Sequence, residues 1–473
     1  MNLWKAKRRS TLLKTTLAVI LVFVILFFSK EFITNYFVRF NLSAIEAPAK
    51  NSRVIVFSPH NDDEALGCTE FIKKTIKNGG AVKVVFTTNG DGFKNAIQLD
   101  YFKLNPEPKD FIKFGYDRQQ ESITALEKLG VLRDNIIFLG YPDGGISDLW
   151  NSYWDNNKPY ISAYTKSNKT PYNNSFTKGS TYTGENIVSD LTKIIEVYKP
   201  TCIVMPHPDD RHPDHYTTNA FVKYTLEKIN YKPDKELLYL VHRGDWPTPM
   251  KESINSYLVP PYKLINTGTT WYALKLNGAD VEEKASIIKI YKTQTRTLGI
   301  LMSAFERKNE LFGKYDDMKF VLKKRYDQDI KLDNSNVIII DPLQDTLSLE
   351  ISRNADISQI SAEISNNNKL HLFLKVDGNV NRYTTYSFNL IFFNEGNVKR
   401  LNITQLKGKI EARYISKDSI MDIKGVSTEV NEKVIHLVIP DTVTGSYKSI
   451  FINGTTSIGN RNLDKTAWRM INK

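Results

Sequence analysis

Two short apolar segments each end in a cluster of histidine and aspartate, and this repeated arrangement constrains the fold of the chain. Residues 53–57 and 200–206 are rich in β-branched and apolar side chains, which is typical of buried strands. The sequence His-Asn-Asp-Asp-Glu follows the first segment at residues 60–64, and His-Pro-Asp-His follows the second at residues 212–215. Helical patterns begin directly after both clusters. Because open α/β sheets bind ligands at the carboxyl ends of their strands, we expect the two clusters to lie together.

The remaining pattern predicts two domains. Strand-like runs at residues 81–86, 135–139 and 237–241 alternate with helical patterns. This alternation predicts a Rossmann-like α/β domain over residues 51–335, with a mostly parallel sheet and flanking helices. From residue 336 short strand-like runs follow one another through Asn, Gly and Asp turns. We therefore predict a C-terminal all-β, sandwich-like domain over residues 336–473.

The two clusters have the composition of a hydrolytic metal site. Three nitrogen and oxygen ligands with one open position are typical of catalytic zinc. Asp62, between His60 and Asp63, could take the proton of a metal-bound water. As an alternative, the carboxylates of residues 62–64 only stabilise a helix N-terminus, and the loop histidines are only solvated. Residues 207–210 (His-Pro-Asp-Asp) mimic the first cluster without its Glu, and we interpret them as part of the cleft lining.

The clusters resemble the hallmarks of the zinc-dependent N-acetylglucosaminyl deacetylases related to PIG-L and LmbE. In that family the first motif reads His-Pro-Asp-Asp-Glu and the second His-Pro-Asp-His. The resemblance implies an LmbE-like fold and a set of roles. It implies that the zinc ligands are His60, Asp63 and His215 and that Asp62 is the general base. It implies that His212 stabilises the oxyanion or protonates the leaving amine, and that Asp214 orients His212. Asn61 replaces the usual proline, which loosens the turn and leaves every chemical group in place.

Weaker matches extend this resemblance over about residues 51 to 300. Arg118-Gln-Gln-Glu121 is similar to an Arg-x-x-Glu helix of the family, and Asp143-Gly144 to a turn at a strand end. They imply that Arg118 and Asp143 bind substrate hydroxyls or the sugar ring. A solvated arginine and a common turn pair are the alternatives. Aromatic residues in the long loop 150–183 could stack on sugar faces or pin the loop to the body.

The amino-terminal segment predicts where the protein lies in the cell. Residues 15–28 carry no charge and follow a basic flank, which favours an uncleaved signal anchor over a cleaved signal peptide. We predict the cytoplasmic flank and transmembrane helix within residues 1–30 and a stalk at 31–50. Since the basic flank stays in the cytoplasm, the prediction is a single-pass protein of the cell membrane with its catalytic domain outside the cytoplasm.

These features together predict a zinc-dependent deacetylase of N-acetylhexosamine units, expected to be N-acetylglucosamine, in a cell-envelope or secreted polysaccharide. Two alternatives remain: a deacetylase of a lipid-linked or small N-acetylglucosamine glycoside, and a non-catalytic glycan-binding surface protein.

Fe²⁺ or Co²⁺ could replace Zn²⁺ in such a site. The net charge of +12 fits anionic surroundings. We expect no nucleic-acid partner, because no stripe of basic and aromatic residues is present. The oligomeric state stays open.

Overall fold

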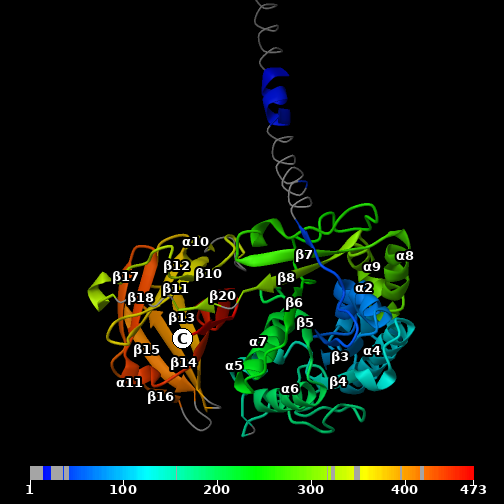
Figure 1. The fold of residues 1–473 in the computed structure, drawn as a ribbon, viewed down its shortest axis with the longest axis horizontal. Coiled ribbons are helices and arrows are strands. Elements are labelled where there is room, and N and C mark those ends of the chain that lie inside the picture. Colours follow the sequence, from blue (N-terminus) through cyan, green and yellow to red (C-terminus); the bar gives the residue numbers. More distant parts are fainter. Residues whose placement is uncertain are drawn as a thin grey trace, which may run out of the picture.

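The computed structural model describes residues 14–22, 36, 42–155, 157–316, 318–320, 325–345, 352–394, 397–415 and 420–473. An α/β domain and a β domain lie side by side (Figure 1). This arrangement confirms the predicted fold class: a mostly parallel α/β domain followed by antiparallel β sheets.

The sheet of the α/β domain has eight strands in the order β1-β7-β8-β6-β5-β2-β3-β4. In chain order they are β1 (Ser43–Ala44), β2 (Arg53–Ser58), β3 (Ala81–Thr88), β4 (Ile136–Tyr141), β5 (Cys202–Pro206), β6 (Lys235–Tyr239), β7 (Thr269–Lys275) and β8 (Asn309–Tyr315). Strand β8 runs antiparallel to β6 and β7, and the other pairs are parallel. The chain order reverses at the neighbouring strands β2 and β5, so a crevice forms beyond their carboxyl ends.

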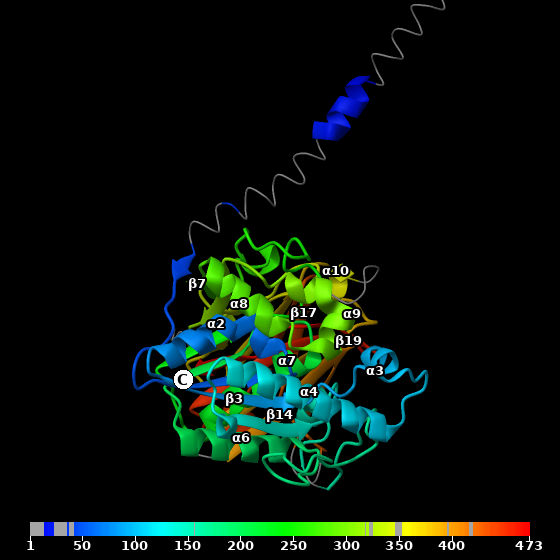
Figure 2. The same cartoon turned by 90° about the vertical axis from the view of Figure 1, so that its right-hand side faces the viewer.

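Helices cover both faces of this sheet, because alternate side chains of each strand point to opposite faces. They are α2 (Asp63–Lys77), α3 (Lys94–Tyr101), α4 (Pro108–Lys128), α5 (Ile146–Asn151), α6 (Gly184–Tyr198), α7 (Pro213–Lys228), α8 (Gly278–Ile288) and α9 (Lys292–Ser303). Val54 and Val56 of β2 pack toward α2, α4, α8 and α9, whereas Ile55 and Phe57 pack toward α5, α6 and α7. In Figure 2, α2 lies on one side of β3 and α6 on the other.

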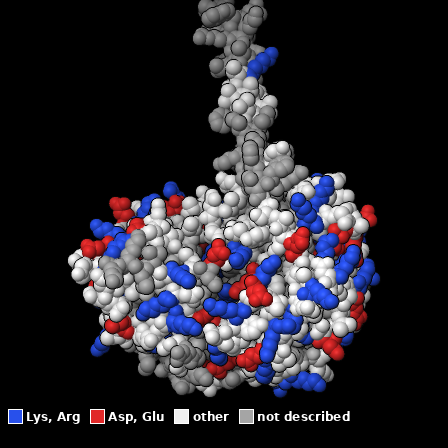
Figure 3. All heavy atoms as spheres, viewed as in Figure 1, with Lys and Arg blue, Asp and Glu red and all other residues white. Residues whose placement is uncertain are grey.

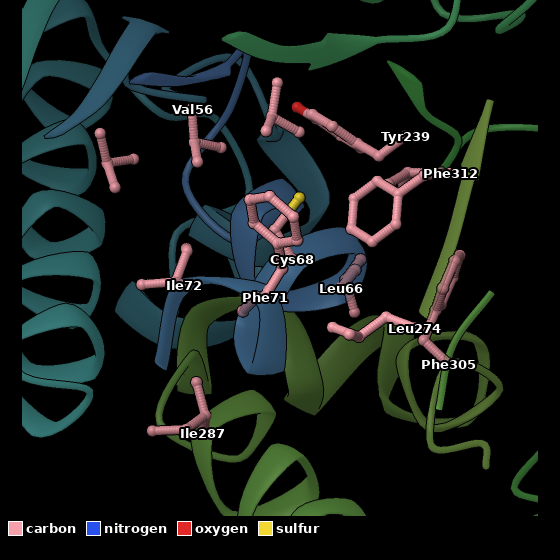
Figure 4. Packing of buried hydrophobic residues seen from close by; sticks show 14 of the residues in the cluster. Val56, Leu66, Cys68, Phe71, Ile72, Tyr239, Leu274, Ile287, Phe305 and Phe312 are labelled. Atoms are coloured by element: carbon pink, nitrogen blue, oxygen red, sulfur yellow. The ribbon is translucent and has the colours of Figure 1, made fainter. Parts of the chain in front are cut away.

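Helix α2 is packed tightly, which fixes the loop in front of it. Its residue Phe71 contacts the ring of Phe312 with the centroids 5.1 Å apart, and Cys68 is buried beside them (Figure 4). A Cβ at Gly67 would lie 2.8 Å from the ring of Tyr239, so only glycine permits this approach to β6. The hydroxyl of Tyr239 donates to the carbonyl of Phe57 at the end of β2.

The C-terminal domain consists of two antiparallel sheets around one apolar core. The first has the order β10 (Val337–Ile340), β11 (Ile357–Ile364), β12 (Leu370–Val376), β18 (Val434–Ile439) and β17 (Ser427–Asn431). The second has the order β16 (Ile420–Asp422), β15 (Lys409–Ile415), β14 (Asn397–Leu406), β13 (Thr385–Asn394), β19 (Ser449–Ile458), β21 (Arg469–Asn472) and β9 (Met318–Lys319), and β20 (Arg461–Lys465) pairs with β19. The short helices α10 (Ser352–Ala355) and α11 (Asp441–Thr444) connect strands.

The two domains share a core. Phe393 of β13 and Phe451 of β19 belong to the same apolar cluster as residues of α5, α6 and α7. The guanidinium of Arg400 lies 4.2 Å from the centroid of the Trp154 ring and donates to the carbonyl of Trp150. The aromatic rings of the predicted long loop therefore pin it to the molecule, which is the second of the two alternatives given for them.

The domain limits differ from the predicted ones in two places. Strand β1 (Ser43–Ala44), which lies within the predicted stalk at residues 31–50, pairs with β7 at the edge of the main sheet. Strand β9 pairs with β21, so the chain joins the C-terminal sheet before residue 336. Both segments are too short and too irregular to be recognised as strands in the sequence.

The predicted single-pass membrane location is wrong. Residues 14–22 form a helix, and within the described part of the chain no helix combines the length and apolar character that a membrane span needs. A span requires about 20 apolar residues. The predicted anchor falls in residues 1–30, of which 1–13 and 23–30 lie outside the described residues.

Candidate metal centre and active site

The loop between β2 and α2 presents the first cluster. Asp62 precedes the helix with a φ angle of 124°, a conformation that non-glycine residues rarely adopt. Its backbone N–H donates to Glu64 Oε2, and Glu64 in turn accepts the hydroxyl protons of Ser58 and Tyr291. Strain of this kind persists only where surrounding contacts hold it, and it is frequent at functional sites.

Four side chains converge at this loop. His60, Asp63, His215 and His242 each offer one donor atom, and these atoms lie within 4.8 Å of one another. Asp63 Oδ2 lies 3.3 Å from Nδ1 of His60 and 3.1 Å from Nε2 of His215, while Asp63 Oδ1 lies 3.5 Å from Nε2 of His242. Strands β2, β5 and β6 thus bring together the three predicted ligands and a fourth histidine.

Asp210 holds the imidazole of His215 from behind. Nδ1 of His215 lies 3.2 Å from Asp210 Oδ2, and the other ring nitrogen faces Asp63. Asp210 also accepts the backbone N–H groups of His212, Val241 and His242, so one carboxylate joins the loops after β5 and β6. A carboxylate behind a histidine is the usual device that orients a metal ligand.

His60 has the corresponding partners. Its Nε2 lies 3.2 Å from both Asp143 Oδ1 and Asp214 Oδ2. Asp214 also accepts the backbone N–H groups of Gly144 and Ile146, which ties α7 to the turn after β4. Its carboxylate thus lies beside His60. The backbone N–H of Asp214, not its carboxylate, contacts His212: it donates to Nδ1 at 3.2 Å.

Asp62 lies beside Arg118. The guanidinium of Arg118 is 3.4 Å from Asp62 Oδ1 and donates to the carbonyls of Asn61 and Gly90. Only glycine fits at position 90, since its φ is +56° and a Cβ would lie 1.8 Å from Nη1 of Arg118. The side-chain amide of Asn61 donates to Ser122 of α4, which anchors this turn.

Burial shifts the pKa values of the charged side chains in this cluster, and neighbouring charged groups oppose these shifts. Burial raises the pKa of Asp62 to about 6, although Arg118 opposes this shift. Burial also raises the pKa of Glu64, to about 8. For Asp63, burial alone would raise the pKa, but His215, His242 and His60 hold it well below its usual value. Burial would lower the pKa of His215, but Asp63 and Asp210 raise it to about 9.

A cavity of about 380 Å³ opens beside these residues. Asp62, His212 and His242 line its polar side, together with Arg211 and Arg243. Another part of the cavity wall is apolar. It consists of Leu66, Trp246, Pro247, Met250, Leu298, Leu301, Met302, Ala304 and Phe305. The presumed base and two histidines therefore face one space that can admit a small organic group.

The structure brings the residues singled out in the sequence to one site. His60, Asp63 and His215 converge, with Asp62 and His212 at the adjoining cavity. The sequence reasoning gave Asp210 no role beyond cleft lining. It predicted that residues 241–247, which close a strand with polar groups, could face the site, and His242 of this segment joins the cluster. His207, in the same mimic of the first motif, is buried against the ring of Trp271 and takes no part in the cluster.

Comparison with protein families gives one match. Residues 55–226 match the model of the PIG-L family, described as GlcNAc-PI de-N-acetylase. The matched segment contains both clusters, from His60 to His215, and ends before His242. No curated protein matches the chain.

Several solved structures match part of this chain at low sequence identity. A conserved protein of Thermus thermophilus is 16% identical, with 53% of this chain and 84% of that chain covered and a TM-score of 0.33. A deacetylase of the teicoplanin biosynthesis pathway is 15% identical, with 55% and 97% covered and a TM-score of 0.37. The N,N'-diacetylchitobiose deacetylase of Pyrococcus horikoshii is 17% identical, with 51% and 70% covered and a TM-score of 0.32. The family match, which spans both clusters, identifies residues 55–226 of this chain as a domain of the PIG-L family of de-N-acetylases.

Proposed function

We propose that this chain is a zinc-dependent deacetylase that hydrolyses the N-acetyl group of an N-acetylhexosamine unit, with N-acetylglucosamine as the expected sugar. One observation carries the proposal: His60, Asp63 and His215 converge within 4.8 Å, and Asp62 lines the cavity beside them. A glycan-binding protein has no need for a buried carboxylate next to three metal-binding side chains.

The donor set fits Zn²⁺. Two imidazole nitrogens and one carboxylate, with an open position toward a cavity, match catalytic zinc sites. Asp63 Oδ1 is buried and has no hydrogen-bond partner, as expected for an oxygen that serves a cation. His60, Asp63 and His215 would hold the ion. When bound, Zn²⁺ would supply Lewis acidity and a water of lowered pKa.

The protein side chains divide the remaining work. Asp62, held by Arg118 and by the N–H contact to Glu64, would accept the proton of the attacking water. Nδ1 of His212 accepts the backbone N–H of Asp214, so Nε2 carries the proton of the neutral imidazole. That N–H can donate a hydrogen bond to the carbonyl oxygen as charge develops. The proton that Asp62 takes from the water then passes to the leaving amine, directly or through His212. His242 lines the same cavity and can contact the acetyl carbonyl.

The expected substrate is a polysaccharide that contains N-acetylhexosamine, and the cavity supports a second candidate. Its apolar wall, which includes Trp246, Leu301 and Phe305, would contact little of a hydrophilic chain. A glycoside with an apolar aglycone, such as a lipid-linked N-acetylglucosamine, would bury that group against the wall. Each buried methylene stabilises such a complex by about 0.8 kcal/mol.

The test is acetate release by the full-length protein after chelation and after reloading with Zn²⁺. The proposal expects no release without metal and restored release with Zn²⁺. Chito-oligosaccharides and alkyl N-acetylglucosaminides of increasing chain length serve as substrates. A KM that falls with alkyl length favours the glycoside, and Leu301→Ser should remove that trend while leaving the KM for oligosaccharides unchanged. Metal-independent release, or no release from any N-acetylated sugar, would contradict the proposal.

A further inference from the structure

A second cluster of acidic side chains lies away from the catalytic centre. Asp341 follows β10, Asp345 lies four residues further on, and Asp464 belongs to β20. One oxygen of each lies within 4.8 Å of the others. Asp341 is 4% exposed and Asp464 is 6% exposed, and Asp345 is partly buried. Three carboxylates so close together and so little solvated repel one another strongly.

Two oxygens of this cluster have no partner. Asp341 Oδ2 and Asp345 Oδ1 are shut off from solvent and accept no hydrogen bond. Buried carboxylate oxygens nearly always have a donor or a cation. Asp464, by contrast, is fixed: its Oδ2 accepts the backbone N–H of Ile357 at 2.7 Å, and its Oδ1 accepts that of Lys465 at 2.8 Å. The cluster therefore combines one oriented carboxylate with two unsatisfied ones.

The basic residues nearby are engaged elsewhere. The ammonium of Lys465 lies 3.6 Å from the centroid of the Tyr216 ring. Arg243 pairs with Asp245 and donates to the carbonyl of Asp209. Arg211 lines the substrate cavity. Within the described residues, neither Lys465 nor these arginines form an ion pair with Asp341, Asp345 or Asp464. Their longer-range attraction offsets only part of the negative charge, and Asp209 adds to it.

We propose that Asp341, Asp345 and Asp464 bind a hard divalent cation, Ca²⁺, between the C-terminal domain and the catalytic domain. A site that offers carboxylate oxygens and no imidazole or thiolate suits Ca²⁺ or Mg²⁺ rather than Zn²⁺. Ca²⁺ accepts six to eight oxygens in flexible geometry and completes its shell with water. A cation here would neutralise the cluster and give the two free oxygens a partner.

The position gives such a cation a structural role. Lys465 on β20 contacts Tyr216 of α7, and Asp209 belongs to the loop that also carries Asp210 and His212. The hydroxyl of Tyr315 donates to Asp209, and Arg243 donates to the same residue. The bound ion would therefore stabilise the contact between the β domain and the loop that supports the catalytic histidines.

The test uses the full-length protein, stripped with a chelator, reloaded with one equivalent of Zn²⁺ and then titrated with Ca²⁺. The expected results are one calorimetric site with a dissociation constant below about 1 mM and a rise of several degrees in the unfolding temperature. Asp345→Asn should weaken Ca²⁺ binding at least tenfold and abolish the rise. Because Oδ1 of Asp345 accepts no hydrogen bond, this variant removes a charge without breaking a bond to that atom, and it is expected to fold.

Two controls separate this site from others. Asp441→Asn, at an exposed position of the same domain, should respond to Ca²⁺ like the wild type. Asp63→Asn, which removes a proposed ligand of the other site, should also keep the response. A wild type that shows no shift at millimolar Ca²⁺ would overturn the proposal, as would unchanged binding by Asp345→Asn. A response to Zn²⁺ alone, with none to Ca²⁺ or Mg²⁺, would contradict the choice of a hard cation.

Discussion

Asp210 and Asp63 hold the imidazole of His215 between them. Nδ1 of His215 lies 3.2 Å from Asp210 and Nε2 lies 3.1 Å from Asp63. The ring is therefore oriented with one nitrogen toward the metal position and the other toward a supporting carboxylate. Because Asp210 also accepts N–H groups of Val241 and His242, it ties the second motif to the segment after β6, which no motif marked.

Asp210→Asn should weaken Zn²⁺ binding about 10- to 100-fold, since the orienting carboxylate is lost. Competition with a chromophoric chelator measures this. Acetate release should recover at saturating Zn²⁺. The matched control is Asp209→Asn, because Asp209 contacts Tyr315 and not His215. Equal Zn²⁺ affinity of the two variants would show that Asp210 does not orient the ligand.

Asp62→Asn should retain Zn²⁺ and lose turnover by about 10²- to 10⁴-fold, the usual contribution of a general base. Metal content after gel filtration and acetate release together check this. His215→Ala is the contrasting variant, since it should lose the metal as well. Normal acetate release by Asp62→Asn would remove Asp62 from its proposed role.

Arg118→Lys tests whether Arg118 positions Asp62 or binds substrate. Its guanidinium donates to two backbone carbonyls and lies beside Asp62, and a lysine cannot reproduce these contacts. We expect kcat to fall with little change in KM, and the free energy of unfolding to fall by about 1–3 kcal/mol for the unsatisfied carbonyls. Gly90→Ala should act in the same way by displacing the guanidinium. An increase in KM alone would instead support the predicted contact with a sugar hydroxyl.

His207 should make the protein sensitive to acid. Burial lowers its pKa to about 4, whereas an unfolded histidine has a pKa near 6.5. Between these values the unfolded state binds more protons, so stability falls as the pH decreases from about 6.5 to about 4. The loss contributed by this group is at most about 3 kcal/mol.

Urea unfolding of the chelated protein across this pH range checks the effect. His207→Gln is expected to be less stable at neutral pH but to show a smaller loss of stability toward pH 4 than the wild type. Parallel pH profiles of the two proteins would show that His207 is not the group responsible.

Much of the site could be predicted because its chemistry lies in contiguous motifs. The proposed ligands His60 and Asp63 are three residues apart, and His212 and His215 are equally close, so one strand-to-loop turn presents each pair. The central strands were recognisable because they are buried on both faces and contain continuous apolar runs. Asn61 was expected to loosen its turn, but its bond to Ser122 could not be foreseen, because Ser122 is 61 positions away in the chain.

Other features could not be predicted because they depend on tertiary contacts. The sequence predicted that the polar residues 241–247 could face the site, but no motif gave His242 a role, because only the neighbouring position of β5 brings it to Asp63. The net charge of the chain also gave little guidance, because basic and acidic side chains are interspersed on the face shown in Figure 3. The hydrophobic N-terminal segment was over-interpreted, since its composition alone does not establish a helix of sufficient length.

The apolar cluster that joins Phe393 and Phe451 to helices α5–α7 has an architectural consequence. Each half of the polypeptide has an apolar core of its own, and the shared cluster is a third one, in which each half covers surface that the other would otherwise leave to water. Separation of the two halves would expose these aromatic rings to water. The β half therefore stabilises the helices that follow the loops after β4 and β5.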